Sequence, residues 1–403
     1  MTAPDSVLRR RDGAPLRVLD FTSVMAGPYC TRLFSDIGAE VVKIEPPEGD
    51  GIRVRPPLRE GRSAYYGHLN CGKQSVALDL KRPQGLTIAR QLAGACDVLV
   101  ENFRPGVMAR FGLDYDSLRA ANPQLVYAAI SGFGQDNADS AKPAYAPIVH
   151  ATSGYDLAFL GHQPPGASPP NTAIFVADVL AAVYAFGAIQ TALLQRERTG
   201  AGQLVDVALM DSILSLLMYE CQDAQFPVGR RRHAYRPMQA ADGFVVIAPT
   251  SQKNYMALIA ALGHPAWSSE PGYRTVAERE ANWADFMNRI ENWTCERTAA
   301  EVEAVLSAAG VPCARYRSFR EVMDDPVSAS RGRFEAVSDE AGPFQVTNPP
   351  FKFSSLSARV RGTVAELGAD ADDVLRRVLG YDEARIAEAR SAGAFGATRE
   401  PSS

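Results

Sequence analysis

The stretch RVLDFTSVMAGPYCTRLFSDIGAEVVKIE, residues 17–45, places a strand, a helix and a second strand in close succession. The runs 17–21 and 40–45 are short and rich in Val, Leu and Ile, which predicts buried strands. The segment 29–39 has apolar residues at helical spacing, and Gly38 is suited to end the helix. This arrangement favours two parallel strands joined by a crossover helix.

The same alternation continues along the first half of the chain. Further strands are predicted at 75–80, 97–102 and 124–132, with helices at 83–95 and 115–122 between them. Strands and helices that alternate in this way predict an α/β fold with a doubly wound, Rossmann-like parallel sheet.

A smaller unit is expected in the second half. Strands at 244–249 and 311–316 and helices at 252–262 and 300–309 suggest a second, shorter α/β pattern. We therefore expect two domains. The large Rossmann-like domain comprises residues 1–222 and 335–403. The small α/β domain, with its linkers, comprises residues 223–334.

Composition limits the possible partners and location. The 42 Lys and Arg residues against 46 Asp and Glu residues give a net charge of −4, so nucleic acid and anionic membranes are not expected as partners. The six cysteines are scattered, which argues against a disulfide framework and a metal site. The N-terminal residues lack the apolar core of a signal peptide. A cytoplasmic location is expected.

One charged residue stands out in the apolar run NTAIFVADVLAAVYAFGAIQTALL, residues 171–194. The run is interpreted as a buried helix, although its length raises the question of a membrane span. Asp178 is its only charged residue, and an isolated buried carboxylate is costly. Asp178 is therefore either the N-cap of the helix or a functional group. One turn later come small residues that could leave room for a substrate: Ala181, Ala182 and Ala185.

The tract 137–172, directly before this helix, has six prolines and little periodicity. It is expected to be a long functional loop. Common nucleotide and hydrolase motifs are missing from the chain: no P-loop, no G-x-S-x-G and no H-E-x-x-H occurs, and no G-x-G-x-x-G follows the first strand.

Several stretches in order resemble the family III CoA-transferases, the CaiB/BaiF group that includes formyl-CoA transferase. They are LDFTSVMAGPYCTRLFSDIGAEVVKIEPP, NCGKQSVALDLKRPQG, DVLVENFRPGVMARFGLDYDSL, SGFG, ADVLAAVYAFGAIQTALLQRERTGAGQLVDVALMDS and FKFS. The resemblance implies two Rossmann-like domains and a homodimer of interlocked rings. It also implies transfer of CoA from an acyl-CoA to a free carboxylic acid, with CoA as substrate and no tightly bound cofactor.

The resemblance assigns roles to individual residues. Asp178 matches the nucleophile, which would form a mixed anhydride and then an aspartyl-CoA thioester. An ionised carboxylate needs no helper base for this attack. The matched CoA contacts are Val24, Met25, Ala26, Leu78, Lys81, Asn102, Phe103 and Arg110. Tyr145 and His150 match positions near the acyl group, with a structural role equally open for His150.

Two departures from formyl-CoA transferase limit the choice of substrate. Met25 stands in place of a polar residue, so formate and oxalate are not assumed, and succinyl-CoA is the donor we expect. The glycine-rich loop that covers the site of that enzyme is absent, and the tract 137–172 is the candidate to shield the anhydride.

Three alternatives remain. A 2-methylacyl-CoA racemase would need a histidine followed by an aspartate where Tyr145 and Ala146 stand, and His150 lies five positions away. A non-catalytic acyl-CoA-binding protein would not need Asp178. An NAD-dependent oxidoreductase would share the sheet pattern but lacks the glycine motif.

Overall fold

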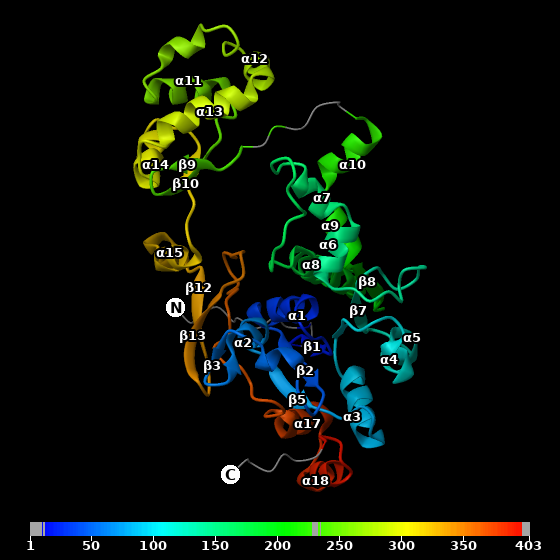
Figure 1. Ribbon diagram of the computed structural model, residues 1–403. Helices are drawn as coiled ribbons and strands as arrows, with labels where there is room; N and C mark the ends of the chain where they lie inside the picture. The colour runs from blue at the N-terminus through cyan, green and yellow to red at the C-terminus, as the bar shows by residue number, and fades with distance from the viewer. Residues whose placement is uncertain (1–9, 11–12, 228–232, 234, 397–403) are drawn as a thin grey trace. The chain divides into compact units, whose positions relative to one another are not determined.

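The computed structural model describes residues 10, 13–227, 233 and 235–396 (Figure 1). These residues separate into two compact units. The large unit comprises the described residues up to Gln225 and from Ser330 onward, and the small unit those from Phe226 to Ala329. The boundaries predicted from the sequence are 222/223 and 334/335.

The large unit is built on a parallel sheet of six strands in the described part of the chain, in the order β5-β2-β1-β6-β7-β8. This confirms the prediction of an α/β fold with a parallel sheet. The order is that of a dinucleotide-binding sheet, with its topological switch point between β1 and β6, where ligands usually bind. The strand bounds are β1 Arg17–Asp20, β2 Glu40–Glu45, β5 Gln74–Ala77, β6 Val98–Glu101, β7 Val126–Ser131 and β8 Leu204–Ala208.

Helices cover both faces of this sheet. One face packs on α1 (Ala26–Asp36) and α8 (Val176–Thr199), whose rings Phe34 and Phe186 meet edge to face at 4.7 Å. The opposite face packs on helices from both ends of the large unit. These are α3 (Pro83–Gly94), α17 (Ala371–Leu379) and α18 (Glu383–Ser391).

Helix α8 is, among the described residues, the one helix long and apolar enough to cross a membrane. In the large unit it is a core helix with one buried side. Ala181, Ala182 and Ala185 are fully buried against the sheet and α1. They therefore leave no room for a substrate, which corrects the expectation from sequence: their small size serves close helix packing. Val183 and Tyr184 lie on the exposed side.

The tract 137–172 is not the continuous loop expected from its prolines. It contains the short helices α6 (Ala146–Thr152) and α7 (Tyr155–Leu160). Pro147 lies in the first turn of α6, where its missing N–H costs nothing. Gly154, at φ 86°, separates the two helices. Pro147 is the one proline of the six that lies in a helix, and the segments 137–145 and 161–172, which hold the other five, are irregular as expected.

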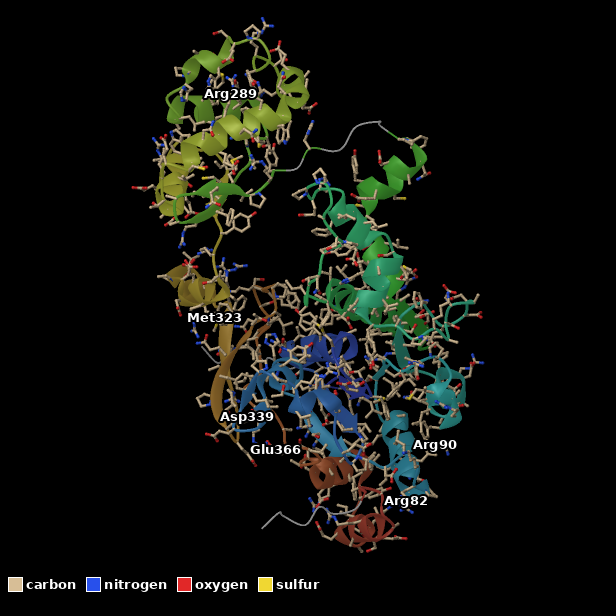
Figure 2. The ribbon with its side chains drawn as sticks, in the orientation of Figure 1. Arg82, Arg90, Arg289, Met323, Asp339 and Glu366 are labelled. Atoms are coloured by element: carbon tan, nitrogen blue, oxygen red, sulfur yellow. The ribbon has the colours of Figure 1, made fainter. Side chains whose placement is uncertain are left out.

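A short β-hairpin at residues 58–63 forms salt bridges with segments from the C-terminal part of the large unit. Arg59 of β3 (Leu58–Arg59) pairs with Asp339 at 2.7 Å, and Arg62 of β4 (Arg62–Ser63) pairs with Glu366. Figure 2 labels the two acidic residues, Asp339 and Glu366. Asp339 ends β12 (Phe334–Asp339), which pairs with β13 (Gly342–Thr347). The C-terminal segment thereby completes the large unit.

The small unit has an antiparallel sheet of order β11-β10-β9. Its strands are β9 Met238–Ala240, β10 Gly243–Ile247 and β11 Cys313–Arg315, and its helices are α11 Gln252–Ala261, η2 Pro265–Ser268, α12 Val276–Ala281, α13 Trp283–Thr294, α14 Ala299–Ala308 and α15 Phe319–Asp324. The remaining elements are η1 Gly51–Val54, α2 Ala64–Asn70, α4 Val107–Arg110, α5 Tyr115–Leu118, α9 Leu209–Leu214, α10 Met218–Gln225 and α16 Pro326–Arg331.

Candidate active site

Asp178 lies in the first turn of α8, two residues beyond the start of the helix. The N-cap position is occupied by Phe175, so the interpretation of Asp178 as an N-cap is wrong. The backbone N–H groups of Ala26 and of Asp178 itself lie close to this carboxylate and act to lower its pKa. Burial has the larger effect and raises the pKa of Asp178 from 3.8 to about 6. The carboxylate is thus partly desolvated yet ionised at neutral pH.

The amide of Ala26 belongs to the start of a second helix. Helix α1 begins at Ala26, three residues earlier than the sequence pattern predicts, because Pro28 fits a first helical turn. The N-terminal ends of α1 and α8 therefore converge on one carboxylate. Both helix N-termini carry partial positive charge, which favours an anion at this point.

The loop that leads from β1 to Ala26 is held by hydrogen bonds across the switch point of the sheet. The side-chain amide of Asn102, just after β6, donates to the Ser23 carbonyl and accepts from the Ser23 N–H, both at 2.8 Å. Val24 has φ 67°, a left-handed conformation that is strained for a β-branched residue. Its N–H donates to Asp50 at 3.3 Å. The loop is fixed in a conformation it would not adopt alone.

Buried charges lie beneath this loop, and the sequence analysis missed them. Lys43 donates to the Thr22 carbonyl at 2.6 Å and pairs with Asp50 at 3.4 Å. Lys73 pairs with Asp20 at 2.9 Å and also donates to the carbonyl of Pro28 in α1. The charged residues Lys43 and Glu45 inside the strand 40–45, which was expected to be buried, were the signal that could have revealed this network.

Three of the expected CoA contacts line one cleft of about 280 Å³ at the carboxyl ends of β2, β5 and β6. They are Leu78, Lys81 and Phe103; Leu78 is buried, and Lys81 is exposed. Phe21 lines the same cleft, at the start of the loop that carries Ala26. The lining is mainly apolar and contains Lys81 together with the carboxylates Glu45, Glu48 and Asp79, so its apolar wall suits a nucleotide ring and Lys81 is its one cation for a phosphate.

The other expected contacts have different positions. Asn102 uses both ends of its amide on Ser23, as described above, so its first role is to fix the loop. Arg110, at the end of α4, is exposed and is not among the residues that line the cleft. Val24 and Met25 belong to the loop before Ala26 and, like Tyr65, pack against the buried cluster of Ile52, Tyr66 and Leu69. The pKa of the Tyr65 phenol is raised mainly by burial, and the negative charge of Asp178 raises it further.

Of the two residues expected near the acyl group, Tyr145 is the N-cap of α6 and His150 lies within that helix. Tyr145 precedes that helix and is 68% exposed. His150 is 3% exposed, and its Nε2 accepts a hydrogen bond from the N–H of Ala177 at 3.1 Å. Of the two roles left open for His150, this contact is the structural one.

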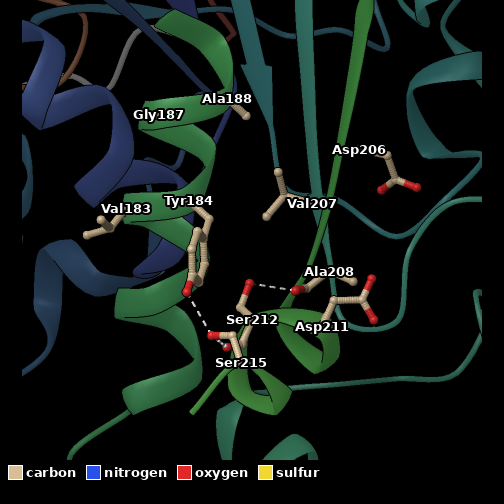
Figure 3. Close-up of a pocket in the computed structure, with 10 residues that line it drawn as sticks. All are labelled: Val183, Tyr184, Gly187, Ala188, Asp206, Val207, Ala208, Asp211, Ser212 and Ser215. Carbon is tan, nitrogen blue, oxygen red and sulfur yellow. Dashed lines mark hydrogen bonds between the residues drawn. The ribbon is translucent and has the colours of Figure 1, made fainter. Parts of the chain in front are cut away.

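A second hollow, of about 510 Å³, lies between α8, β8 and α9 and contains none of the expected residues (Figure 3). Tyr184 and Ser215 form a hydrogen bond of 2.7 Å across it, and Ser212 donates to the Ala208 carbonyl at 2.7 Å. Its walls include the exposed side of α8. It lacks a cation among its lining residues and is no candidate for CoA phosphates.

Comparison with known proteins gives consistent matches along the chain. The model of CoA-transferase family III matches residues 14–371. The formyl-CoA:oxalate CoA-transferase of Afipia carboxidovorans is 30% identical, over 94% of this chain and 97% of that protein. The succinyl-CoA–D-citramalate CoA-transferase of Chloroflexus aurantiacus is 31% identical, over 92% and 95%. A crystal structure of a CaiB/BaiF family protein from Brucella suis has a TM-score of 0.80 at 28% identity, covering 90% of this chain and 98% of that one.

Proposed function

The chain belongs to CoA-transferase family III, and we propose that it transfers CoA reversibly from an acyl-CoA to a free carboxylic acid through Asp178. The observation that supports this most directly is the partly buried Asp178 carboxylate with the Ala26 N–H close enough to lower its pKa. The carboxylate is partly buried, so a nucleophilic oxygen is kept from bulk water. A fixed amide donor beside it can hold the charge of an oxyanion.

The reaction follows in four balanced steps. An oxygen of Asp178 attacks the thioester carbonyl carbon, the C–S bond breaks, and CoA thiolate leaves a mixed anhydride. The thiolate then attacks the side-chain carbonyl carbon of Asp178, which releases the donor acid and leaves an aspartyl-CoA thioester. The acceptor carboxylate displaces the thiolate to form a second anhydride. The thiolate attacks the acyl carbon of the acceptor, and Asp178 is regenerated as a carboxylate.

No external energy source is required, because each step exchanges one activated acyl bond for another. The Ala26 amide is positioned to stabilise the oxyanion that forms on the Asp178 carbonyl when thiolate or acceptor attacks it. The N-terminus of α8 adds to the same effect. The aspartyl bond forms at neutral pH, where Asp178 is ionised.

For the substrates, we propose binding of the nucleotide part of CoA in the cleft lined by Leu78, Lys81 and Phe103. Succinyl-CoA is the donor to test first. The relative from Chloroflexus aurantiacus carries succinyl-CoA in its name. In addition, Met25 removes a polar group that formyl-CoA transferase has at this loop.

The covalent step can be tested directly. The protein is loaded with succinyl-CoA without an acceptor and treated with hydroxylamine or borohydride, and peptides are analysed by mass spectrometry. Label on Asp178 is expected, and none in the Asp178→Asn variant. Catalytic transfer to a panel of acids, seen as new thioesters by mass spectrometry, would accompany it. Wild-type turnover with no label on Asp178, or undiminished turnover in Asp178→Asn, would refute the proposal.

We also propose that the active form is a homodimer in the cytoplasm. The exposed side of α8 presents Val183, Tyr184 and Leu194, which are 47%, 48% and 69% exposed. The hollow beside Tyr184 extends this surface (Figure 3). Light scattering on the purified protein tests the proposal, and a monomer at micromolar concentration with full activity would contradict it.

A further inference from the structure

The N-terminus of α8 is capped from another helix. Phe175 occupies the N-cap position and offers no side-chain acceptor, so the first N–H groups of α8 need other partners. Ala177 is fully buried, which means that water cannot satisfy its N–H. That N–H donates to Nε2 of His150 at 3.1 Å. The imidazole therefore performs the task that Ser, Thr, Asp or Asn performs at most helix starts.

His150 is itself held firmly. It lies on α6 next to the fully buried Val149, and α6 packs against α7, α8 and α9. Its ring centroid is 5.0 Å from that of Tyr155 in α7. The acceptor atom thus has a fixed place relative to the sheet, and it fixes the first turn of α8 through Ala177.

Accepting at Nε2 requires the neutral imidazole with its proton on Nδ1. A protonated ring would turn a second donor toward the Ala177 N–H and place positive charge at the positive end of α8. Burial lowers the pKa of His150 below 6.5, and Asp156 in α7 acts in the opposite direction. The neutral form that the contact needs is the form present at neutral pH.

Ala177 immediately precedes Asp178, so the orientation of this turn determines where the Asp178 carboxylate meets the Ala26 amide. We propose that His150 is a positioning residue for the transfer reaction, which holds the first turn of α8 through the Ala177 N–H so that Asp178 faces Ala26. This inference rests on the proposed role of Asp178 as the nucleophile. It assigns His150 no contact with the substrate.

Two substitutions in the full-length protein separate this role from a general effect on folding. His150→Leu keeps an apolar side chain but removes the acceptor. His150→Gln restores an acceptor, its side-chain carbonyl, that does not titrate. We expect His150→Leu to lower kcat about ten- to hundredfold, since misplacing a reacting group by about 1 Å can cost that much. The KM for acyl-CoA should change little, and His150→Gln should recover most of kcat.

The control is Val149→Ala, one residue earlier on the same helix. It opens a cavity in the core beside His150 but leaves the bond to Ala177 intact, so it destabilises the fold without removing the acceptor. Its kcat should stay near that of the wild type at a temperature where all variants are folded by circular dichroism.

The decisive measurement is the rate at which Asp178 becomes labelled in a single turnover with succinyl-CoA and hydroxylamine. Slow labelling in His150→Leu with near-normal labelling in His150→Gln supports the inference. Wild-type labelling rates in His150→Leu, or equal losses in His150→Leu and His150→Gln, would overturn it while leaving Asp178 as the nucleophile. Absence of any label in the wild type would instead refute the proposed function.

Discussion

Replacing Asp178 by Asn should stabilise the protein while abolishing transfer. Burial raises the pKa of Asp178 from 3.8 to about 6, which corresponds to at most about 3 kcal/mol of destabilisation of the charged form. Asn is close in shape to the protonated acid and can still accept the hydrogen bond from Ala26. The N-terminus of α8 favours the charged form by about 0.3–1 kcal/mol, and this is lost in Asn. A net gain of about 2 kcal/mol in the free energy of unfolding is expected at pH 8.

The pH dependence of this gain follows from its origin. Between pH 3.8 and about 6 the folded wild type holds a proton on Asp178 that the unfolded chain has released. Its free energy of unfolding therefore falls as pH rises through this interval and is constant above about pH 7. The Asn variant has no such loss. The difference between the two proteins should shrink to about half its full value by pH 5.

The assay can distinguish the two units. All three tryptophans, Trp267, Trp283 and Trp293, lie in the small unit, whereas Asp178 lies in the large one. Urea unfolding followed by far-ultraviolet circular dichroism reports the large unit together with the small one, and tryptophan fluorescence reports the small unit. The substitution should shift the transition of the large unit and leave the local fluorescence response of the small unit unchanged. A variant no more stable than the wild type at pH 8, or a gain equal at pH 5 and pH 8, would refute the account of the raised pKa.

Three further predictions concern activity. The value of kcat/KM should fall about tenfold per pH unit below about pH 6, because protonated Asp178 cannot attack the thioester. A steady-state pH profile of kcat/KM that is flat down to pH 5 would contradict this. The Asn102→Asp variant keeps the acceptor for the Ser23 N–H but turns a second oxygen toward the Ser23 carbonyl, which loosens the loop. We expect kcat to drop about tenfold or more in initial-rate assays. An unchanged kcat would argue against the role of this loop. The Lys81→Gln variant should have a KM for acyl-CoA several-fold higher at low salt, with little change in kcat. This difference in KM should become smaller as salt is added, because salt screens a charge contact with phosphate. A difference in KM that does not depend on salt would count against a phosphate contact.

Much of the fold could be predicted from local patterns. The alternation of strands and helices between residues 17 and 132 led to the parallel sheet, since the strands are short buried runs and the helices 29–39, 83–95 and 115–122 separate most of them. The helices α6 and α7 within the tract 137–172 were missed, because proline at the first turn of a helix, such as Pro147, looks the same in sequence as proline in a loop. Only the packing of α6 against α8 and α9 decides between them.

The site was less accessible from sequence for a physical reason. Asp178 was recognisable because a lone charge in an apolar run is costly. Ala26 was matched as a CoA contact, but that its backbone amide lies beside Asp178 was not predicted, because backbone groups leave no mark in the sequence. The same holds for His150, whose partner is the N–H of Ala177. Residues whose role is to bind backbone atoms are identified only when the tertiary structure brings them together.

The strained Val24 shows how the fold maintains this site. A β-branched residue with φ 67° costs about 1–2 kcal/mol. The segment is held by the Asn102 amide on one side and by Asp50 and Lys43 on the other. Breaking one partner of a buried ion pair such as Lys43–Asp50 costs about 3–5 kcal/mol, more than relief of the strain would return. The folded protein therefore has a lower free energy with the strained loop than without it. As a result, the Ala26 amide is directed at Asp178 before any substrate binds.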